Sequence, residues 1–175
     1  MIIRECVYDV VDTNQGQILI AECLTSFKVV AVYLLDENLD DQITDLHDSY
    51  PTVHFIRGTP TQTAAVVQAI NTLDTKVKIN AVHNGNTVFS TQVYNAIQNI
   101  PKGETRSYSD IAREIGNPDA IRAVAGACSR NNLAYIVPCH RVIGSNGNLS
   151  GYRWGISKKR SLLLAEGAQL NFAAM

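Results

Sequence analysis

The first thirty-five residues consist of short runs rich in Val and Ile that are separated by turns. The runs cover residues 5–13, 16–23 and 27–35, and short polar connections such as NQG lie between them. Branched aliphatic side chains fit the pleated surface of a sheet. We therefore predict three strands that form an antiparallel meander.

Two helical patterns follow this predicted sheet. Residues 36–50 form a polar run, and residues 61–73 carry apolar side chains at helical spacing, with Thr61 in position to cap the helix. Residues 76–82, KVKINAV, read as a further short strand. We predict that residues 1–84 form a small N-terminal α/β domain with an antiparallel sheet.

The rest of the chain has mainly helical patterns. HNGN at residues 83–86 is typical of a linker. Residues 86–100 are predicted to form a helix, and residues 107–116 a second one with Ser107 or Ser109 near its start and Gly116 at its end. The apolar face of the first of these helices would contain Val88, Phe89, Val93, Tyr94, Ile97 and Ile100.

A third helix is predicted at residues 120–130, with Asp119 as its cap. Helix, tight turn and helix together outline a helix-turn-helix, although many packed helical hairpins share that outline. The last helix has small residues on its surface and a single long side chain, Arg122, among its early positions. The small residues are Ala120, Ala123, Gly126 and Ala127.

The overall prediction is an α+β fold with domains at residues 1–84 and 87–175. Charge also divides the chain. Residues 1–100 carry 5 basic and 11 acidic side chains, whereas residues 101–175 carry 10 basic and 5 acidic ones. Only the second part could attract a polyanion, unless the segregation reflects solvated surface charge alone.

Composition excludes several classes of protein. No apolar run approaches the length of a membrane span, and the N-terminal residues lack the pattern of a secretory signal, so we expect a cytoplasmic protein. The four cysteines form no CxxC pair, and free thiols are the default in that compartment. Cys6, Cys23 and His83 could contribute to a metal site, but this scattered set is weak evidence, and we predict none.

The candidate chemistry lies in YIVPCHRVIG at residues 135–144, where Cys139 precedes His140. An ordinary thiol is mostly protonated at neutral pH, and a nearby base or positive charge raises the thiolate fraction. Arg141 would add positive potential near Cys139. Adjacent side chains on a strand point to opposite faces, so a Cys–His contact needs a turn at Pro138 or a bridging water. Glu166, at the end of a Leu-rich helix, is the best group to orient the imidazole. The alternative is an inert thiol buried in an aliphatic strand.

The motif Pro138-Cys139-His140-Arg141-Val142 resembles the active-site signature of the O6-alkylguanine-DNA alkyltransferases, the methylated-DNA–protein-cysteine methyltransferases, and is most similar to the Ada type. Supporting motifs fall at the family's spacings. GETRSYSDIA and GNPDAIRAVAGA match its helix-turn-helix, and SGYRWGISKK matches its substrate-pocket loop. The resemblance is strong from about residue 87 onward, whereas residues 1–84 match the family's ribonuclease H-like domain only in size and outline.

The resemblance implies direct reversal of DNA damage without a cofactor. The alkyl group on O6 of guanine, and the methyl group of O4-methylthymine, would pass to Cys139 in a single-turnover reaction, with His140 and Glu166 as the other catalytic residues. The partner would be double-stranded DNA bound through its minor groove by a monomer, at the nucleoid in a prokaryote or in the nucleus in a eukaryote. The implied DNA- and substrate-binding residues are Tyr108, Ala120, Arg122, Ala123, Ala127, Asn131, Val142 and Tyr152.

Each implied role has a physical reason. The small residues of the recognition helix would fit a narrow groove, and Arg122 would fill the space left by an extruded base. Tyr108 would rotate the nucleotide and donate a hydrogen bond to guanine, and Tyr152 would wall the pocket. Asn131 would form the hinge after the helix, and main-chain groups near Cys139 and Val142 would read the base edge.

This chain also departs from the family pattern. Asp119 stands where a basic residue is common and would repel phosphate. Tyr94 replaces a tryptophan, which we expect to matter only for packing. We expect Arg153 and Trp154 to make the pocket rim bulky, so that methyl adducts react well and benzyl adducts poorly. Lys28 and Asn80 stand roughly where some relatives place zinc-binding histidines, so no zinc site is carried over.

Three other functions remain open at this point. A Cys–His hydrolase would share the nucleophile but would leave the helix-turn-helix unused. A protein that binds alkylated bases without repairing them would lack the cysteine. A transcriptional regulator of the Ada type would need a Cys-rich metal-binding region that this sequence does not contain.

Overall fold

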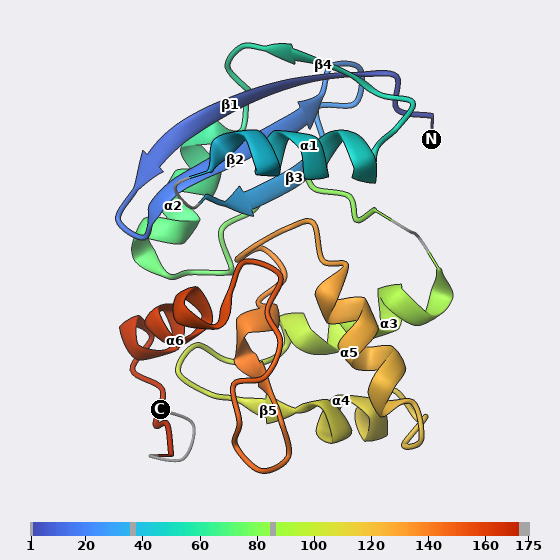
Figure 1. The fold of residues 1–175 in the computed structure, drawn as a ribbon, viewed down its shortest axis with the longest axis vertical. Helices are drawn as coiled ribbons and strands as arrows, with labels where there is room; N and C mark the ends of the chain where they lie inside the picture. Colours follow the sequence, from blue (N-terminus) through green and yellow to red (C-terminus); the bar gives the residue numbers. More distant parts are fainter. Residues whose placement is uncertain (1, 36–37, 85–86, 172–175) are drawn as a thin grey trace. The chain divides into compact units, whose positions relative to one another are not determined.

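The computed structural model describes residues 2–35, 38–84 and 87–171, and the chain divides into two compact units. The first unit contains residues 1–84 together with 132–134, and the second contains residues 85–131 and 135–175. The predicted α+β class is confirmed (Figure 1). The predicted linker at residues 83–86 lies partly outside the described residues.

The first unit is built around a four-stranded sheet. The predicted meander is present as β1 (Glu5–Thr13), β2 (Gly16–Cys23) and β3 (Val29–Leu34), which pair antiparallel in that order. A fourth strand, β4 (His54–Arg57), was not predicted; it pairs parallel with β1 and gives the order β3-β2-β1-β4. Four residues with alternating polar side chains are too short a signal to recognise without their partner strand.

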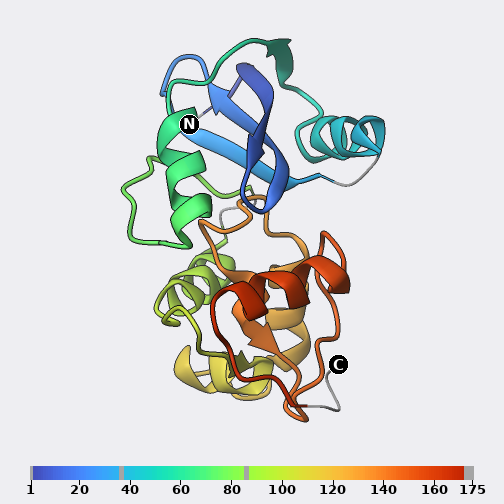
Figure 2. The ribbon, with the colours of Figure 1, turned by 90° about the vertical axis from the view of Figure 1, so that its left-hand side faces the viewer.

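Two helices cover the opposite faces of this sheet (Figures 1 and 2). They are α1 (Leu39–Ser49) and α2 (Thr63–Thr72), close to the predicted ranges. Every residue of β3 is buried, as expected for a strand packed on both faces. Helix α2 begins after Gln62 rather than at Thr61, whose hydroxyl instead donates to the buried Glu22 carboxylate at 2.8 Å.

Two sequence-based boundaries need correction in the first unit. Residues 76–82 contain an isolated bridge between Val29 and Ala81 instead of a strand. Residues 132–134, which the sequence placed in the second domain, belong to the first unit because Leu133 forms a parallel bridge with Val32. The Asn132 side chain adds a hydrogen bond of 2.7 Å to the Tyr50 hydroxyl.

The second unit is mainly helical, as predicted. Its helices are α3 (Val88–Gln98), α4 (Tyr108–Glu114), α5 (Ile121–Ser129) and α6 (Ile156–Ala165). A 3-10 helix, η1 (Cys139–Arg141), leads into β6 (Val142–Ile143), which pairs with the short β5 (Arg106–Ser107). Helix α6 packs against the segment before it through a cluster of Leu149, Leu163 and Ala168.

Local capping explains most of the helix boundaries in this unit. Ser107 caps α4 and forms a reciprocal pair with Asp110, and Gly116 ends that region with a φ of 76°, where a residue with a side chain would be strained. The predicted apolar face of α3 is wrong at Val88, which is 79% exposed because it lies in the first turn. No helix of the described ranges is long and apolar enough to cross a membrane.

Candidate active site

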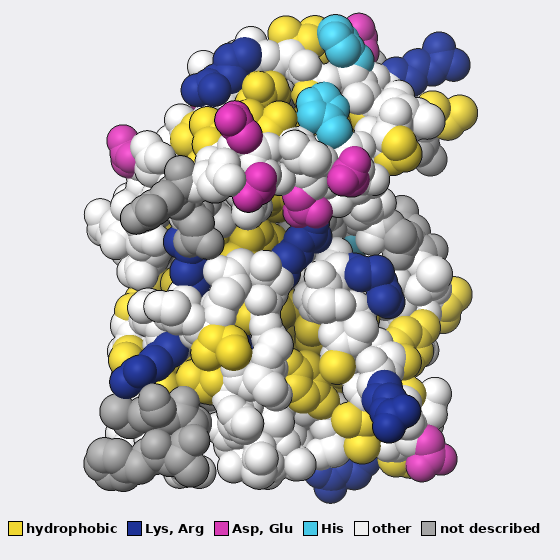
Figure 3. Space-filling model, viewed as in Figure 1, with side chains coloured by type: hydrophobic (Ala, Val, Ile, Leu, Met, Phe, Trp, Pro, Cys, Tyr) yellow, Lys and Arg dark blue, Asp and Glu magenta, His cyan; other side chains and the backbone are white. Residues whose placement is uncertain are grey.

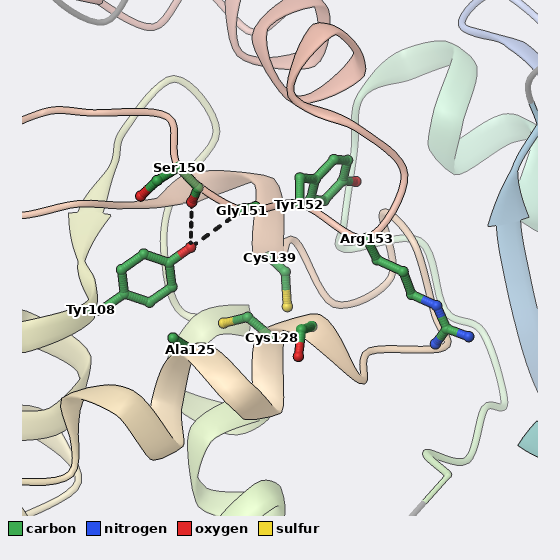
Figure 4. A pocket seen from close by; sticks show the side chains of 9 residues that line it. Tyr108, Ala125, Cys128, Cys139, Ser150, Gly151, Tyr152 and Arg153 are labelled. Atoms are coloured by element: carbon green, nitrogen blue, oxygen red, sulfur yellow. Dashed lines mark hydrogen bonds between the residues drawn. The ribbon is translucent and has the colours of Figure 1, made fainter.

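A pocket of about 430 Å³ opens on the second unit and contains the candidate nucleophile (Figure 4). Tyr108, from the start of α4, forms one wall, and Cys128 of α5 forms another. Cys139 begins η1, and the loop at residues 150–153 closes the remaining side. Four segments that are distant in sequence therefore meet around one thiol.

The turn that a useful Cys139–His140 arrangement requires is present. Pro138 precedes η1, and its carbonyl accepts a hydrogen bond of 2.9 Å from the Arg141 N–H. The expected active-site strand is thus a 3-10 turn, which does not force adjacent side chains to opposite faces as a strand does. Both Cys139 and His140 are buried, with 3% and 0% exposure.

His140 and Glu166 form the predicted base–carboxylate pair. Nε2 of His140 lies 3.0 Å from Oε1 of Glu166, which caps the C-terminal end of α6. A carboxylate only accepts hydrogen bonds, so Nε2 carries the proton and the Nδ1 lone pair is left to receive another. Within the described part of the chain, Nδ1 has no hydrogen-bond partner.

Arg141 holds the same carboxylate from a second direction. Its Nε and terminal nitrogens donate to Glu166 at 3.1 and 2.6 Å, and another nitrogen donates to the Ile100 carbonyl at 2.7 Å. Burial alone would raise the pKa of Glu166, but the hydrogen bonds from His140 and Arg141 outweigh it and lower the pKa to about 2. The charge of Arg141 is therefore largely neutralised by Glu166. Arg141 stabilises the His140–Glu166 pair and does not act directly on the thiol.

The ionisation of His140 and Cys139 suits proton transfer from thiol to imidazole. Burial lowers the pKa of His140, against the opposing effect of Glu166, so the imidazole is neutral at pH 7. Burial raises the pKa of the Cys139 thiol well above its ordinary value, and the adjacent Cys128 raises it further. A hydrogen bond from Asn131 and the charge of Lys159 oppose this rise. The thiol thus needs a base at the moment of reaction.

Lys159 is a buried cation that the sequence analysis missed. Its ammonium donates to the Val142 carbonyl at 2.5 Å and to the Gly151 carbonyl at 3.2 Å, and it lies 5.7 Å from the Tyr108 ring centroid. Burial lowers its pKa to about 8. Lys159 lies three residues before the buried Leu162, on the same face of α6. This spacing was the only feature of the sequence that indicated a buried lysine.

Tyr135 is a second residue that the sequence analysis missed. It is buried, its backbone φ is 70°, and its ring lies 5.1 Å from the His140 ring. A large residue rarely adopts this conformation, and such strain is concentrated at functional sites. The Tyr135 ring packs against the His140 ring and thus limits the movement of the imidazole.

Of the four residues predicted to wall or rim the pocket, three line it and one does not. Tyr108 and Tyr152 both line the pocket, and the Tyr108 hydroxyl donates to the Ser150 carbonyl at 3.1 Å (Figure 4). Arg153 also lines it, but its guanidinium donates to the Asn131 carbonyl at 2.9 Å. Trp154 does not form the rim, because it is buried with its ring against Tyr152.

The main-chain groups of Val142, which were predicted to help read the base edge, lie beside Cys139 in the structure. Val142 is fully buried, its N–H donates to the Cys139 carbonyl, and its own carbonyl accepts from Lys159. Each of its main-chain groups therefore has a bond inside the protein. The carbonyl has a second lone pair, so the reading of a base edge near Val142 stays a prediction. Asn131 does support the site, since its amide donates to the Val137 carbonyl at 3.0 Å.

The predicted DNA-facing residues divide into exposed and buried ones. Arg122 and Ala123 are exposed, and Ala120 is partly buried at the N-cap of α5. Ala127 is wrong as a surface residue, because it is fully buried and its carbonyl accepts from the Tyr94 hydroxyl at 2.9 Å. Asp119 does not cap α5 either, since Ala120 occupies that position without a side-chain bond.

Cys6, Cys23 and His83 were the residues in the sequence that could contribute to a metal site. Cys6 and Cys23 face each other across β1 and β2. In the ranges that the structure describes, no group of three or more His, Cys, Asp or Glu side chains is placed to hold a metal ion.

Comparison with known proteins gives the context of this geometry. Residues 88–168 match the family model described as "6-O-methylguanine DNA methyltransferase, DNA binding domain". The "Bifunctional transcriptional activator/DNA repair enzyme Ada" of Escherichia coli is 38% identical over 162 residues, which cover 91% of this chain and 45% of that protein. The "Probable methylated-DNA--protein-cysteine methyltransferase" of Acanthamoeba polyphaga mimivirus is 38% identical, with coverage of 89% and 93%.

Solved structures agree with these sequence matches. The crystal structure of Mycobacterium tuberculosis O6-methylguanine methyltransferase aligns with a TM-score of 0.73 and 32% identity, covering 95% of this chain and 96% of that one. A structure of Mycobacterium tuberculosis OGT in complex with DNA aligns with a TM-score of 0.71 and 92% coverage of each chain. The chain spans about half the length of several curated relatives, with 45% of the Escherichia coli protein and 53% of the Methanosarcina acetivorans one. Identity of this level over nine-tenths of the chain, with the same fold, means that this chain belongs to the 6-O-methylguanine DNA methyltransferase family.

Proposed function

We propose that this chain repairs alkylated DNA by direct reversal. It transfers the alkyl group from O6 of guanine, and the methyl group of O4-methylthymine, to Cys139. The observation that carries this proposal is the position of the Cys139 thiol in a pocket beside the buried His140–Glu166 pair. Family membership supports the same reaction.

The thiol is activated by the neutral imidazole. His140 takes the thiol proton on Nδ1, directly or through water, while Glu166 stabilises the imidazolium that forms. The resulting thiolate has the nearby Lys159 charge and the Asn131 hydrogen bond to stabilise it. This arrangement keeps the thiol protonated until a substrate fills the pocket.

The transfer is a displacement at carbon. The sulfur forms a bond to the alkyl carbon, the bond between that carbon and O6 breaks, and its electron pair leaves with guanine. The leaving guanine anion then takes a proton from water, and the imidazolium returns the thiol proton to the solvent. The Tyr108 hydroxyl, whose pKa burial raises to about 12, stays protonated and can donate a hydrogen bond to the base as charge develops.

The product explains why the protein acts once. A thioester can be hydrolysed because water attacks its acyl carbon, but a thioether has no such carbon. The alkyl group therefore stays on Cys139. Each chain removes one lesion, and the reaction requires no cofactor.

The proposed partner is double-stranded DNA, bound by a monomer through the minor groove. The target base must leave the duplex to reach a pocket of this kind. The second unit shows several Lys and Arg side chains and few acidic ones on the face in Figure 3. Arg122 and Ala123 are exposed on α5, whose other residues reach the pocket, so this helix can link groove contact to base capture.

Intact-mass measurement tests the proposal. The protein is mixed with duplex DNA that contains O6-methylguanine, and a gain of one methyl group is expected, mapped to the peptide that holds Cys139. Cys139→Ala should abolish the gain and retain DNA binding. A continuous release of product beyond one equivalent would instead indicate a hydrolase, and an unmodified protein that still binds the lesion would indicate a non-repairing relative.

Arg122→Ala tests the role of the recognition helix. We expect slower transfer from duplex DNA and a smaller effect on a short single strand, because only the duplex requires base extrusion. Lys102→Ala is a matched control, since it removes the same charge from an exposed turn. Equal effects of the two substitutions would show that Arg122 contributes charge alone.

A further inference from the structure

The candidate pocket contains two thiols, and alkyl transfer uses only one of them. Cys128 lies near the end of α5, and Cys139 begins η1; both line the same pocket. Figure 4 shows both sulfur atoms directed into the same space. Both cysteines are free in this structure.

The Cys128 thiol makes Cys139 a weaker nucleophile, because it disfavours the Cys139 thiolate. The neighbouring Cys128 thiol raises the pKa of Cys139, against the opposing effects of Lys159 and Asn131. A side chain without an ionisable group would avoid this effect. The presence of Cys128 is therefore not explained by activation of Cys139.

We propose that Cys128 and Cys139 form a reversible disulfide that closes the pocket under oxidising conditions. The pair would react with a thiol oxidant of the peroxide class or with a small disulfide. The consequence for repair rests on the proposed function, whereas formation of the bond does not.

The chemistry balances with peroxide as the oxidant. One thiolate attacks a peroxide oxygen, forms a sulfenic acid and releases water after proton transfer. The second thiolate attacks that sulfur, forms the S–S bond and releases a second water. Two thiols and one hydrogen peroxide thus give one disulfide and two waters, with the sulfurs oxidised and the peroxide reduced.

The location of the pair allows this bond to form. A disulfide places its sulfurs about 2.05 Å apart, so the two thiols must come together within the pocket that both of them line. Cys128 is the last residue but one of α5, where helix ends open readily. The bond would also tie α5 to η1 across the pocket mouth.

A disulfide would protect a group that can be used only once. Further oxidation of a sulfenic acid to sulfinic and sulfonic acids is irreversible, whereas a disulfide is restored by reduction. A neighbouring thiol converts the sulfenic acid before this happens. Cys128 would then preserve Cys139 for a later lesion at the cost of temporary inactivity.

The test compares the wild-type chain with Cys128→Ser after treatment with hydrogen peroxide. Free thiols are blocked, and non-reducing peptide mapping follows. In the wild type we expect a cross-linked pair of peptides that hold Cys128 and Cys139. Methyl transfer should fall by roughly tenfold or more and return with dithiothreitol, each protein being compared with its own untreated activity.

In Cys128→Ser we expect no such cross-link and a loss of activity that dithiothreitol does not restore, with Cys139 found as sulfinic acid. Equal irreversible oxidation of Cys139 in both proteins, or a cross-link only between Cys6 and Cys23, would overturn the proposal. If the variant fails to fold, the wild-type peptide map still decides. If the reduced protein accepts no methyl group, the proposed function fails while the map remains a valid test of the disulfide.

Discussion

The two units bury charged side chains for different purposes. In the described residues of the first unit, Glu22 is the buried charged side chain, and its carboxylate accepts from the Thr61 and Gln62 N–H groups at 3.0 Å each. These bonds fix the segment that leads into α2. The Glu22 carboxylate therefore has a structural role in the first unit. It is far in sequence from the residues that line the pocket.

The second unit gathers its buried ionisable side chains around Cys139. His140, Arg141, Lys159 and Glu166 are all buried there, and they are joined to one another or to the backbone around Cys139. Burying ionisable groups is costly unless each is paired. Their concentration around one thiol is typical of a site whose ionisation is tuned for reaction.

Glu166→Ala should give the largest effect on stability. It leaves the Arg141 guanidinium buried without its partner, for which we expect a loss of about 3–5 kcal/mol in the free energy of unfolding. Urea unfolding measures this loss. Glu166→Gln keeps the volume and should cost less stability while slowing methyl transfer by roughly 10²–10⁴-fold, because the imidazolium loses its counter-charge.

The pH dependence of Glu166 has a defined sign. Its folded pKa of about 2 lies below the ordinary value of 4.5, so its contribution is complete above about pH 4.5 and is lost as pH falls toward 2. The stability difference between wild type and Glu166→Gln should shrink over that range. A constant difference would contradict the role of the ionised carboxylate.

Lys159→Met should have the next largest effect. The substitution keeps the apolar stem and removes the bonds to the Val142 and Gly151 carbonyls, so we expect a loss of about 1–3 kcal/mol. Methyl transfer should slow by roughly tenfold, since the pocket loop loses its anchor and the thiolate loses a nearby charge. Single-turnover kinetics separates the second effect from the first.

The same pair of proteins gives a second pH test. The pKa of Lys159 is about 8 in the folded protein against an ordinary 10.5, so the unfolded chain binds more protons between these values and stability rises with pH there. Compared with Lys159→Met, the wild type should gain stability from about pH 8 to 10.5. A difference that does not change with pH would show that this lysine is not desolvated as described.

Glu22→Gln tests the other side of the comparison. We expect a loss of about 1–3 kcal/mol from weakened buried hydrogen bonds and no change in the rate of methyl transfer, because this carboxylate serves the first unit alone. Urea unfolding and single-turnover assays on one preparation measure both. A slower transfer at full folding would remove the distinction between the two kinds of buried charge.

Arg153→Ala should have the smallest effect. The sequence predicted a bulky rim from Arg153 and Trp154, but only Arg153 lines the pocket. We expect benzyl adducts to react more slowly than methyl adducts in the wild type, and the substitution to narrow this gap by less than roughly tenfold. Equal wild-type rates for both adducts would contradict the prediction that Arg153 restricts large adducts at the pocket.

The sequence was informative where local patterns determine structure. Val- and Ile-rich runs predicted β1 to β3, and Ser107 and Gly116 marked the ends of α4 and its turn. Strand β4 and the bridge at Leu133 were missed because each depends on a partner distant in sequence. Such pairing leaves little trace in a short segment.

The site shows the same division. Cys139, His140 and Glu166 could be identified because a specific motif and its resemblance name them. Lys159 and Cys128 could not, since a lysine on a helix is usually exposed and a cysteine in an Ala-rich helix reads as packing. Their proximity to Cys139 exists only after α5, η1 and α6 have come together.

Transfer of an isotopically labelled methyl group tests the central claim most directly. Duplex DNA with trideuteromethyl on O6 of guanine is mixed with the wild-type chain, and the protein is mapped by mass. The account predicts one trideuteromethyl group per chain, on the sulfur of Cys139, and none on Cys139→Ser or with undamaged duplex. An unlabelled Cys139 in folded protein that binds the damaged duplex, or label on another residue, would contradict it.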